Sequence, residues 1–129
     1  MSANLLDTNI ALFALGAPRR LSAAVRTAIE AGSNVLSVVS YWEVTLKCAK
    51  GTLEIDDPEA WWESALDQLR ATPLPLRQEH ITALHRLPPH HKDPFDRVLI
   101  AQAITEKSAL LTSDREISRY ASQHLKVIR

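Results

Sequence analysis

The sequence predicts an α/β fold in which helices pack on a mainly parallel sheet. Short apolar runs alternate with helical patterns along the whole chain, which is typical of this class. A length of 129 residues suits one domain that buries roughly two thirds of the surface its unfolded chain exposes. Only three glycines are present, which leaves little room for flexible linkers. We therefore expect a single domain over residues 1–129.

The chain begins with a strand and two helices. The apolar run "NLLD" (4–7) predicts the first strand, and "TNIALFAL" (8–15) predicts the helix that it feeds. A second helix is expected over residues 22–31, because Ser22 can cap its start and Gly32 can end it.

The middle of the chain predicts a strand, two helices and an edge strand. "NVLSVV" (34–39) is the second strand, and Ser40 can cap a helix that continues to Lys50. An Asp-Pro pair opens the next helix, "EAWWESALDQLRA" (59–71). "TPLPL" (72–76) can only be an edge strand or an extended connector, because its prolines lack the N–H that a central strand needs.

The last third predicts three helices and two strands. "EHITALHRL" (79–87) is a short amphipathic helix that ends before two prolines. The next helix runs from the Asp-Pro pair at 93–94 to about residue 107, and its apolar "VLIAQAI" core predicts that it packs between other elements. "ALLTS" (109–113) is a strand, Asp114 starts a short helix, and "LKVI" (125–128) closes the sheet.

Charge and cysteine content narrow the class of protein only slightly. Fifteen basic residues balance fifteen acidic ones, so no overall positive field indicates a nucleic-acid binder, although a local basic patch remains compatible with this balance. The one cysteine, Cys48, cannot form an internal disulfide, which fits a reducing compartment. The start of the chain lacks a signal-peptide pattern, and no apolar run reaches the length of a membrane span. These features predict a cytoplasmic protein.

Five acidic residues fall where parallel strands end or where a buried helix begins. Asp7 ends the first strand, Asp114 follows the "ALLTS" strand, and Glu43 falls in the first turn of the helix after the second strand. Asp93 and Asp96 lie at the start of the apolar helix. Ligands of open α/β sheets bind beyond the carboxyl ends of the strands, so these positions are candidates for a functional site.

Each acid also has an ordinary structural explanation. The three aspartates that precede helices can be N-caps, and Glu43 can pair with Lys47 one turn away. The surroundings favour a site, because Glu43 stands inside "VVSYWEVTL" and Asp96 adjoins "VLIAQAI". Charges in such apolar surroundings need a counter-charge, and a hard cation such as Mg²⁺ or Mn²⁺ supplies one to clustered carboxylates.

The histidines do not favour a zinc site. His90 and His91 follow two prolines and are expected in an exposed loop. His80 and His85 are five residues apart, which does not bring their rings together on one helix face. A zinc site is therefore disfavoured, and no cysteine pair is present to support one.

The ordered motifs "LLDTNI", "SxxSYWEV", "HKDPFDRVLIAQA" and "LLTSD" resemble those of PIN-domain ribonuclease toxins of the VapC group, over essentially the whole chain. The resemblance implies a three-layer α/β/α fold and a Mg²⁺- or Mn²⁺-dependent endoribonuclease of a type II toxin-antitoxin system. It also implies a cognate antitoxin as partner and a homodimer. By position in the motifs, the implied metal ligands and catalytic residues are Asp7, Glu43, Asp96 and Asp114.

Further residues are expected to act around these acids. Either Glu43 or Asp114 is expected to accept the proton of the attacking water. Residues expected to orient carboxylates or water by hydrogen bonding are Asn9, Asp93, Thr112 and Ser113. Cationic residues near the expected site, which can contact RNA, are Lys47, Lys92, Arg97 and Arg115.

Two other functions remain open from the residues alone. A phosphatase or phosphotransferase could use Asp7 as its nucleophile, although "DTN" lacks the second aspartate of the Asp-x-Asp sites. A non-catalytic interaction module would use the acids as caps and its tryptophans for binding. Of the adjacent Trp61 and Trp62, one is expected to face the core and the other to serve a dimer interface.

Overall fold

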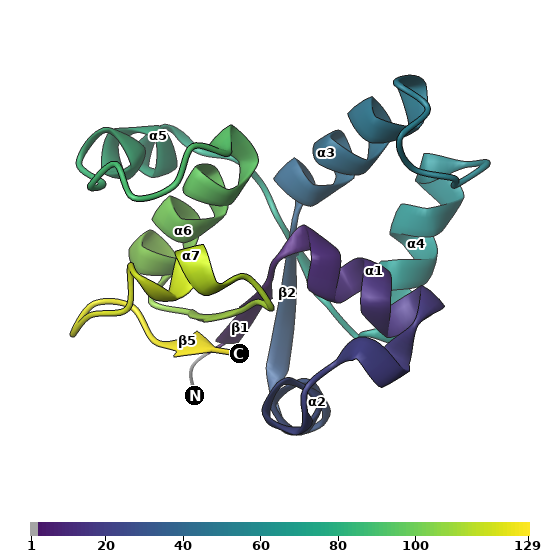
Figure 1. Cartoon of the computed structure of the whole chain (residues 1–129), viewed down its shortest axis with the longest axis horizontal. Helices are drawn as coiled ribbons and strands as arrows, with labels where there is room; N and C mark the ends of the chain where they lie inside the picture. The colour runs from purple at the N-terminus through teal and green to yellow at the C-terminus, as the bar shows by residue number, and fades with distance from the viewer. Residues whose placement is uncertain (1–2) are drawn as a thin grey trace.

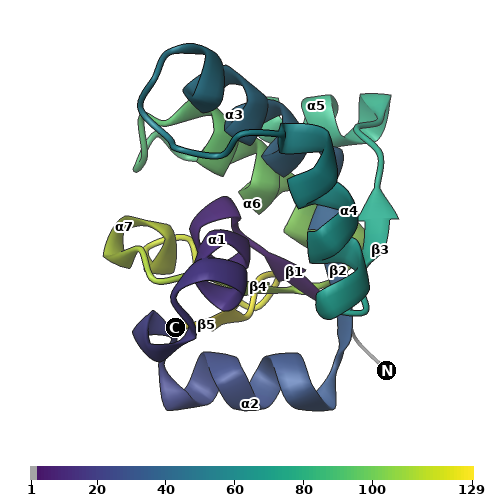
Figure 2. The ribbon, with the colours of Figure 1, turned by 90° about the vertical axis from the view of Figure 1, so that its right-hand side faces the viewer.

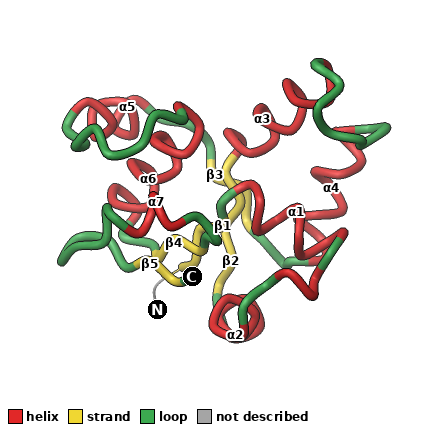
Figure 3. The backbone as a smooth tube through the Cα atoms, in the orientation of Figure 1, coloured by secondary structure: helices red, strands yellow, loops and turns green. Residues whose placement is uncertain are grey.

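The structure is a computed structural model that describes residues 3–129. A five-stranded sheet of order β3-β2-β1-β4-β5 forms its centre, and each strand pairs in parallel with its neighbours. Figure 3 shows the strands between the helices. The strands are β1 (Ala3–Leu6), β2 (Ser33–Ser37), β3 (Thr72–Leu74), β4 (Ala109–Leu111) and β5 (Val127–Ile128). The parallel sheet that the alternating pattern predicts is therefore confirmed.

Helices follow nearly every strand and cover both faces of the sheet. In Figure 1, α5, α6 and α7 lie to the left of β2, and α1, α3 and α4 lie to its right. The second view shows α2 along the lower side of the molecule (Figure 2). The helices are α1 (Thr8–Gly16), the 3₁₀ turn η1 (Pro18–Arg20), α2 (Ala23–Ala31), α3 (Val38–Ala49), α4 (Pro58–Gln68), α5 (Gln78–His85), α6 (Pro94–Glu106) and α7 (Arg115–Ser118).

Two apolar cores hold the layers together, one on each face of the sheet. Neighbouring residues of a strand point to opposite faces, so Leu6 packs with Ile10 of α1 and Trp62 of α4, whereas Leu5 packs with Leu99 and other residues of α6. All five of these side chains are buried. This arrangement is the three-layer α/β/α fold expected of the sequence. Among the described residues, none of the helices combines the length and the apolarity that crossing a membrane requires.

The register of the central strands brings their carboxyl ends to one edge of the sheet. Leu6 of β1 pairs with Leu111 of β4, and the N–H of Asp7 donates to the carbonyl of Leu111 at 2.9 Å. Leu5 pairs with Val35 of β2, which ends two residues later. The residues that follow these strands therefore meet at this edge.

The predicted boundary between β2 and α3 is wrong. The strand ends at Ser37 and the helix begins at Val38, although Val38 and Val39 are β-branched and favour a strand. The Ser37 hydroxyl accepts from the Val39 N–H at 3.0 Å and caps the helix in place of Ser40, which is buried inside it. This cap outweighs the local strand preference, and it moves Glu43 from the first turn to the second.

Other predicted boundaries hold more closely. Ser22, Asp57 and Asp93 cap α2, α4 and α6 as expected. β3 is an edge strand, as its prolines require. The central residues of α6 are buried on all sides, and the helix ends at Lys107, whose φ of 56° is left-handed.

Gly32 follows α2 at a position where the backbone packs closely against Asn4 of β1. A Cβ at this position would clash with the Asn4 side-chain amide and would meet the Ala28 carbonyl oxygen at 2.9 Å. The Asn4 amide donates to that same carbonyl at 3.0 Å. We expect Gly32→Ala to lower the free energy of unfolding by about 1–3 kcal/mol, measured by denaturant titration. Gly16→Ala is the control, because nothing lies within 4 Å of its Cβ position, and equal loss in both variants would contradict this reasoning.

Candidate active site

Asp7 is the most deeply placed of the candidate acids. It directly follows β1 and caps α1, where one carboxylate oxygen accepts from the Ile10 N–H at 2.9 Å and the other accepts from the Thr112 hydroxyl. Its residue is 3% exposed. Burial raises the pKa of Asp7 to about 6, the two hydrogen bonds oppose this rise, and the charges of Glu43 and Asp114 add to it.

Glu43 lies in the second turn of α3, and both of its carboxylate oxygens have partners. The Thr8 hydroxyl donates to Oε1 at 2.6 Å, and the Lys47 ammonium lies 2.7 Å from Oε2. The residue is 4% exposed. The expected pairing of Glu43 with Lys47 is therefore present, and the contact from Thr8 was not anticipated from the sequence.

Asp96 lies in the first turn of α6, among other carboxylates. Its pKa is raised to about 7, first by burial and then by the charges of Asp93, Asp7 and Glu43, while His91 lowers it. Such Coulombic effects require that these groups lie near one another, although they come from different elements. Asp96 therefore lies close enough to Asp7 and Glu43 to be affected by their charges.

Asp114 and His91 complete the cluster. Asp114 caps α7, with one oxygen accepting from the Glu116 N–H at 2.8 Å. The His91 Nε2 lies 2.8 Å from Asp96 Oδ2 and 3.1 Å from Asp114 Oδ2. One donor atom from each of these three side chains lies within 4.8 Å of the other two.

The expectation that His91 belongs to an exposed loop is wrong. The loop before α6 folds inward, and the His91 side chain is only 15% exposed. Its position within "HKDPFDRVLIAQA", two residues before Asp93, was the one sequence signal that could have identified it. No local pattern specifies which way this loop folds, so the contact itself required the structure.

The expected orienting residues divide into two groups. The Thr112 hydroxyl donates to Asp7 and accepts from the Asp114 N–H at 3.0 Å, so it links two of the acids. Asp93 accepts from the N–H groups of residues 95 and 96 as the cap of α6. Asn9 and Ser113 are exposed. Thr112 thus contacts the Asp7 carboxylate and Asp93 contacts the backbone of Asp96, whereas the second group is exposed to solvent.

The cationic residues also differ in where they lie. Lys47 pairs with Glu43, and the hydrogen bond to that carboxylate is the main reason that the pKa of Lys47 is raised. The Arg97 guanidinium donates to the Pro88 carbonyl at 3.1 Å and to the Tyr120 hydroxyl at 3.3 Å, so it supports the loop before α6. The two that remain exposed to solvent are Lys92 and Arg115.

The exposed aromatic side chain is not one of the adjacent tryptophans of α4. Trp62 is buried and stacks on Tyr41, and Trp61 packs partly buried against the same core, so Trp61 is not the freely exposed aromatic. Trp42, next to Glu43 in sequence, is 54% exposed and packs edge-to-face on Phe95 with ring centroids 5.0 Å apart. The exposed aromatic surface therefore lies where α3 meets α6 and not on α4.

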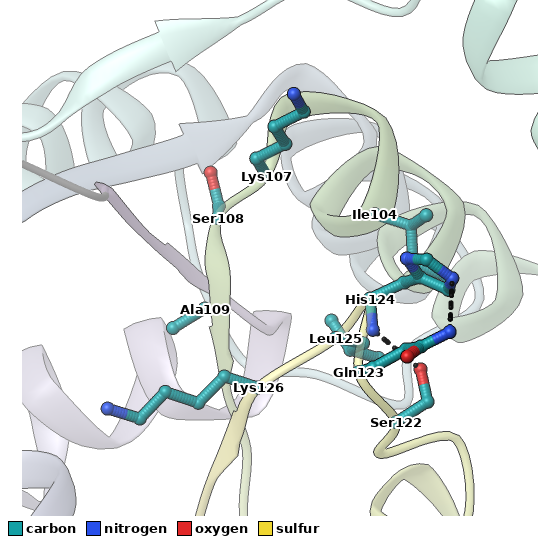
Figure 4. Close-up of a pocket in the computed structure, with 9 residues that line it drawn as sticks. All are labelled: Ile104, Lys107, Ser108, Ala109, Ser122, Gln123, His124, Leu125 and Lys126. Carbon is teal, nitrogen blue, oxygen red and sulfur yellow. Dashed lines mark hydrogen bonds between the residues drawn. The ribbon is translucent and has the colours of Figure 1, made fainter.

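A separate cavity lies away from the acidic cluster. It measures about 500 Å³ and lies where α6 ends and β4 begins, at the opposite end of the strand from Asp114. Figure 4 shows its lining, which includes Lys107, Ser108, His124 and Lys126. None of the candidate acids lines this cavity, so it is not part of the candidate active site.

The acidic cluster suits a divalent cation. Carboxylates from the ends of β1 and β4 and from α3 and α6 lie close enough to influence one another's charge, and oxygen is the ligand type that Mg²⁺ and Mn²⁺ prefer. The raised pKa values of Asp7 and Asp96 indicate that their ionised forms lack enough compensating charge. The donor set therefore fits a divalent cation, which would supply that charge.

Comparison with known proteins gives one family and one fold. A family model described as the PIN domain matches residues 5–123. No curated protein matches the chain significantly.

Three solved structures share the fold over nearly the full length of both chains. VapBC from Salmonella typhimurium bound to DNA has a TM-score of 0.71 at 15% identity, covering 98% of this chain and 97% of that one. VapBC2 from Rickettsia felis, bound to a fragment of promoter DNA, has a TM-score of 0.69 at 16% identity, covering 98% and 99%. VapBC-5 from Mycobacterium tuberculosis, a member of the VapBC family of toxin-antitoxin systems, has a TM-score of 0.66 at 17% identity, covering 100% and 99%.

Proposed function

This chain belongs to the PIN-domain family, and on that premise we propose that it is a divalent-cation-dependent endoribonuclease, the toxin of a type II toxin-antitoxin system. The observation that carries the proposal is the meeting of acids from four elements at the carboxyl edge of the sheet. These acids are Asp7, Glu43, Asp96 and Asp114.

In the proposed reaction, water hydrolyses an RNA phosphodiester bond at this edge. The four acids would hold one or two Mg²⁺ or Mn²⁺ ions, with Thr112 and Thr8 fixing the carboxylates of Asp7 and Glu43 by hydrogen bonds. When bound, the cation acidifies water and stabilises negative charge on the phosphate. Glu43 or Asp114 would accept the proton of the attacking water.

The proposed contacts to RNA use cations at the rim of the cluster. Arg115 and Lys92 are exposed beside Asp114 and Asp93 and are free to contact phosphates. Lys47 is already paired with Glu43, so its contribution to RNA binding would be smaller. Arg97 would act indirectly, through the loop that it supports.

The proposed partner is an antitoxin, and the proposed state is a cytoplasmic homodimer. Support for the antitoxin comes from the solved structures of the same fold, which include VapBC complexes and a toxin-antitoxin complex from Klebsiella pneumoniae. The exposed Trp42 beside Phe95 offers the kind of aromatic surface that is enriched in protein interfaces.

The two alternative functions have weaker support. An aspartyl nucleophile must be accessible, but Asp7 is buried and both of its oxygens accept hydrogen bonds. A non-catalytic module explains the caps formed by Asp7 and Asp114. It does not explain why Asp96, which caps no helix, is held beside other carboxylates at a raised pKa.

RNA cleavage with defined product ends is the test of the proposed function. We expect purified protein to cleave RNA in Mg²⁺ or Mn²⁺, to be inactive in EDTA, and to leave 5′-phosphate and 3′-hydroxyl ends, because water and not the ribose 2′-hydroxyl attacks. The ends are assigned by ligation-dependent sequencing with and without phosphatase treatment. Products that carry 2′,3′-cyclic phosphate, or equal cleavage in EDTA, would rule out this mechanism.

A further inference from the structure

His91 lies between two of the acids and has no role in the mechanism given above. Its Nε2 lies 2.8 Å from Asp96 Oδ2 and 3.1 Å from Asp114 Oδ2. These acids come from the start of α6 and from the loop after β4, so the imidazole connects two separate parts of the fold. Without a group between them, the like charges of the two carboxylates would repel each other.

The contacts of the ring define which nitrogen carries the proton. The backbone N–H of Asp93 donates to the Nδ1 of His91 at 3.4 Å, so Nδ1 acts as an acceptor. When Asp96 and Asp114 are ionised, as cation ligands are, they can only accept hydrogen bonds, so the nitrogen that faces them is then the donor. Both sides of the ring therefore favour a proton on Nε2.

The backbone of His91 is held firmly in this position. Its N–H donates to the Tyr120 hydroxyl at 2.9 Å, and that hydroxyl donates to the Pro88 carbonyl at 2.8 Å. The ring of His90 packs edge-to-face on Tyr120, with centroids 5.2 Å apart. Because Tyr120 is 5% exposed, this anchor is itself part of the core.

We infer that His91 is a positioning residue of the cation site, whose Nε2–H holds the carboxylates of Asp96 and Asp114 together. The inference rests on the proposed function, because it concerns the same cation site. Partners that orient metal ligands typically contribute about 10- to 100-fold to metal affinity. As a hydrogen-bond donor, His91 would raise the affinity for Mg²⁺ and Mn²⁺ to the same extent.

The first test uses the metal-free protein at a pH high enough for Asp96 to be ionised, and it needs no activity. Long-range ¹H–¹⁵N spectra of the imidazole rings, with His91 assigned from the spectrum of His91→Gln, report which nitrogen is protonated. We expect a proton on Nε2, whether or not Nδ1 also carries one. An Nε2 without a proton would overturn the inference, because the ring could not then donate to either carboxylate.

The second test measures cation binding by titration calorimetry in three variants. We expect His91→Ala to weaken Mg²⁺ and Mn²⁺ binding equally, by about 10- to 100-fold. His91→Gln should restore most of the affinity, because its amide N–H reaches about as far as Nε2. His124→Ala is the matched control and should bind both ions as the wild type does, since His124 is exposed and lines the separate cavity, away from the acids.

Other results would separate this inference from its rivals. Unchanged affinity in His91→Ala would overturn it. A loss confined to Mn²⁺ that glutamine does not restore would instead assign His91 as a nitrogen ligand, because imidazole favours the softer ion. A wild-type protein that binds both cations but cleaves no RNA would reject the proposed function and leave the role of His91 intact. If no cation binds, the proposed function fails, and the protonation of Nε2 alone decides whether His91 holds the carboxylates together.

Discussion

Replacing Asp96 with asparagine is expected to reduce cation-dependent RNA cleavage by at least about 1,000-fold while making the metal-free protein more stable. Removal of one carboxylate weakens cation binding at the centre of the proposed site. The gain in stability has a separate cause, since burial and neighbouring charges raise the pKa of Asp96 to about 7 and the folded protein therefore disfavours its ionised form. Asparagine retains the shape of the side chain and an oxygen that can accept from His91.

The two effects are measured independently, by initial cleavage rates in Mg²⁺ and by thermal unfolding in EDTA at neutral pH. Asp57→Asn is the matched control, because Asp57 is an exposed cap of α4 and asparagine caps helices about equally well. The control should change neither quantity appreciably. A cleavage rate within tenfold of wild type would defeat the assignment of Asp96. A lower melting temperature for Asp96→Asn would show that its charge stabilises the fold.

The metal-free protein is also expected to lose stability as the pH rises from about 4 to about 7. The ordinary pKa of an aspartate is 3.8, whereas those of Asp7 and Asp96 are raised to about 6 and about 7. Over this range the folded chain binds more protons than the unfolded chain, so the free energy of unfolding falls with increasing pH. Each unit of pKa difference corresponds to about 1.4 kcal/mol, so the rises from 3.8 to about 6 and to about 7 together give at most about 7 kcal/mol.

The measurement is thermal unfolding in EDTA between about pH 4 and about pH 8, repeated with saturating Mn²⁺. A cation that binds only the folded protein should restore about 2.7 kcal/mol at 100 times its dissociation constant. Asp96→Asn should show a shallower dependence, with the remaining slope due to Asp7. Stability that increases over this pH range in EDTA would contradict the assigned burial of these charges.

The sequence was sufficient to predict the sheet and the positions of the acids near it. Apolar runs followed by Asp7 and Asp114 marked strand ends, and parallel strands bring such ends to one edge. The caps of α2 and α4 followed from Ser22 and Asp57, because capping depends only on neighbouring backbone. Local chemistry determines these features, so local patterns were enough to predict them.

Contacts between distant parts of the chain could not be predicted in this way. Thr8 reaches Glu43 across 35 residues, and His91 reaches Asp114 across 23. Both depend on how α3 and the loop before α6 pack on the sheet, which no local pattern specifies. The prediction of where α3 begins failed for a related reason. The preference of two valines for a strand competed with the cap from Ser37.

The edges of the sheet limit how two copies of this chain can associate. β3, at one edge, is three residues long and contains Pro73, which has no N–H to offer an incoming strand. β5, at the other edge, is only two residues long. Neither edge provides a template for extending the sheet into a second molecule, and this also protects the protein against edge-to-edge aggregation. Any self-association is therefore expected to use side chains and not the pairing of strands.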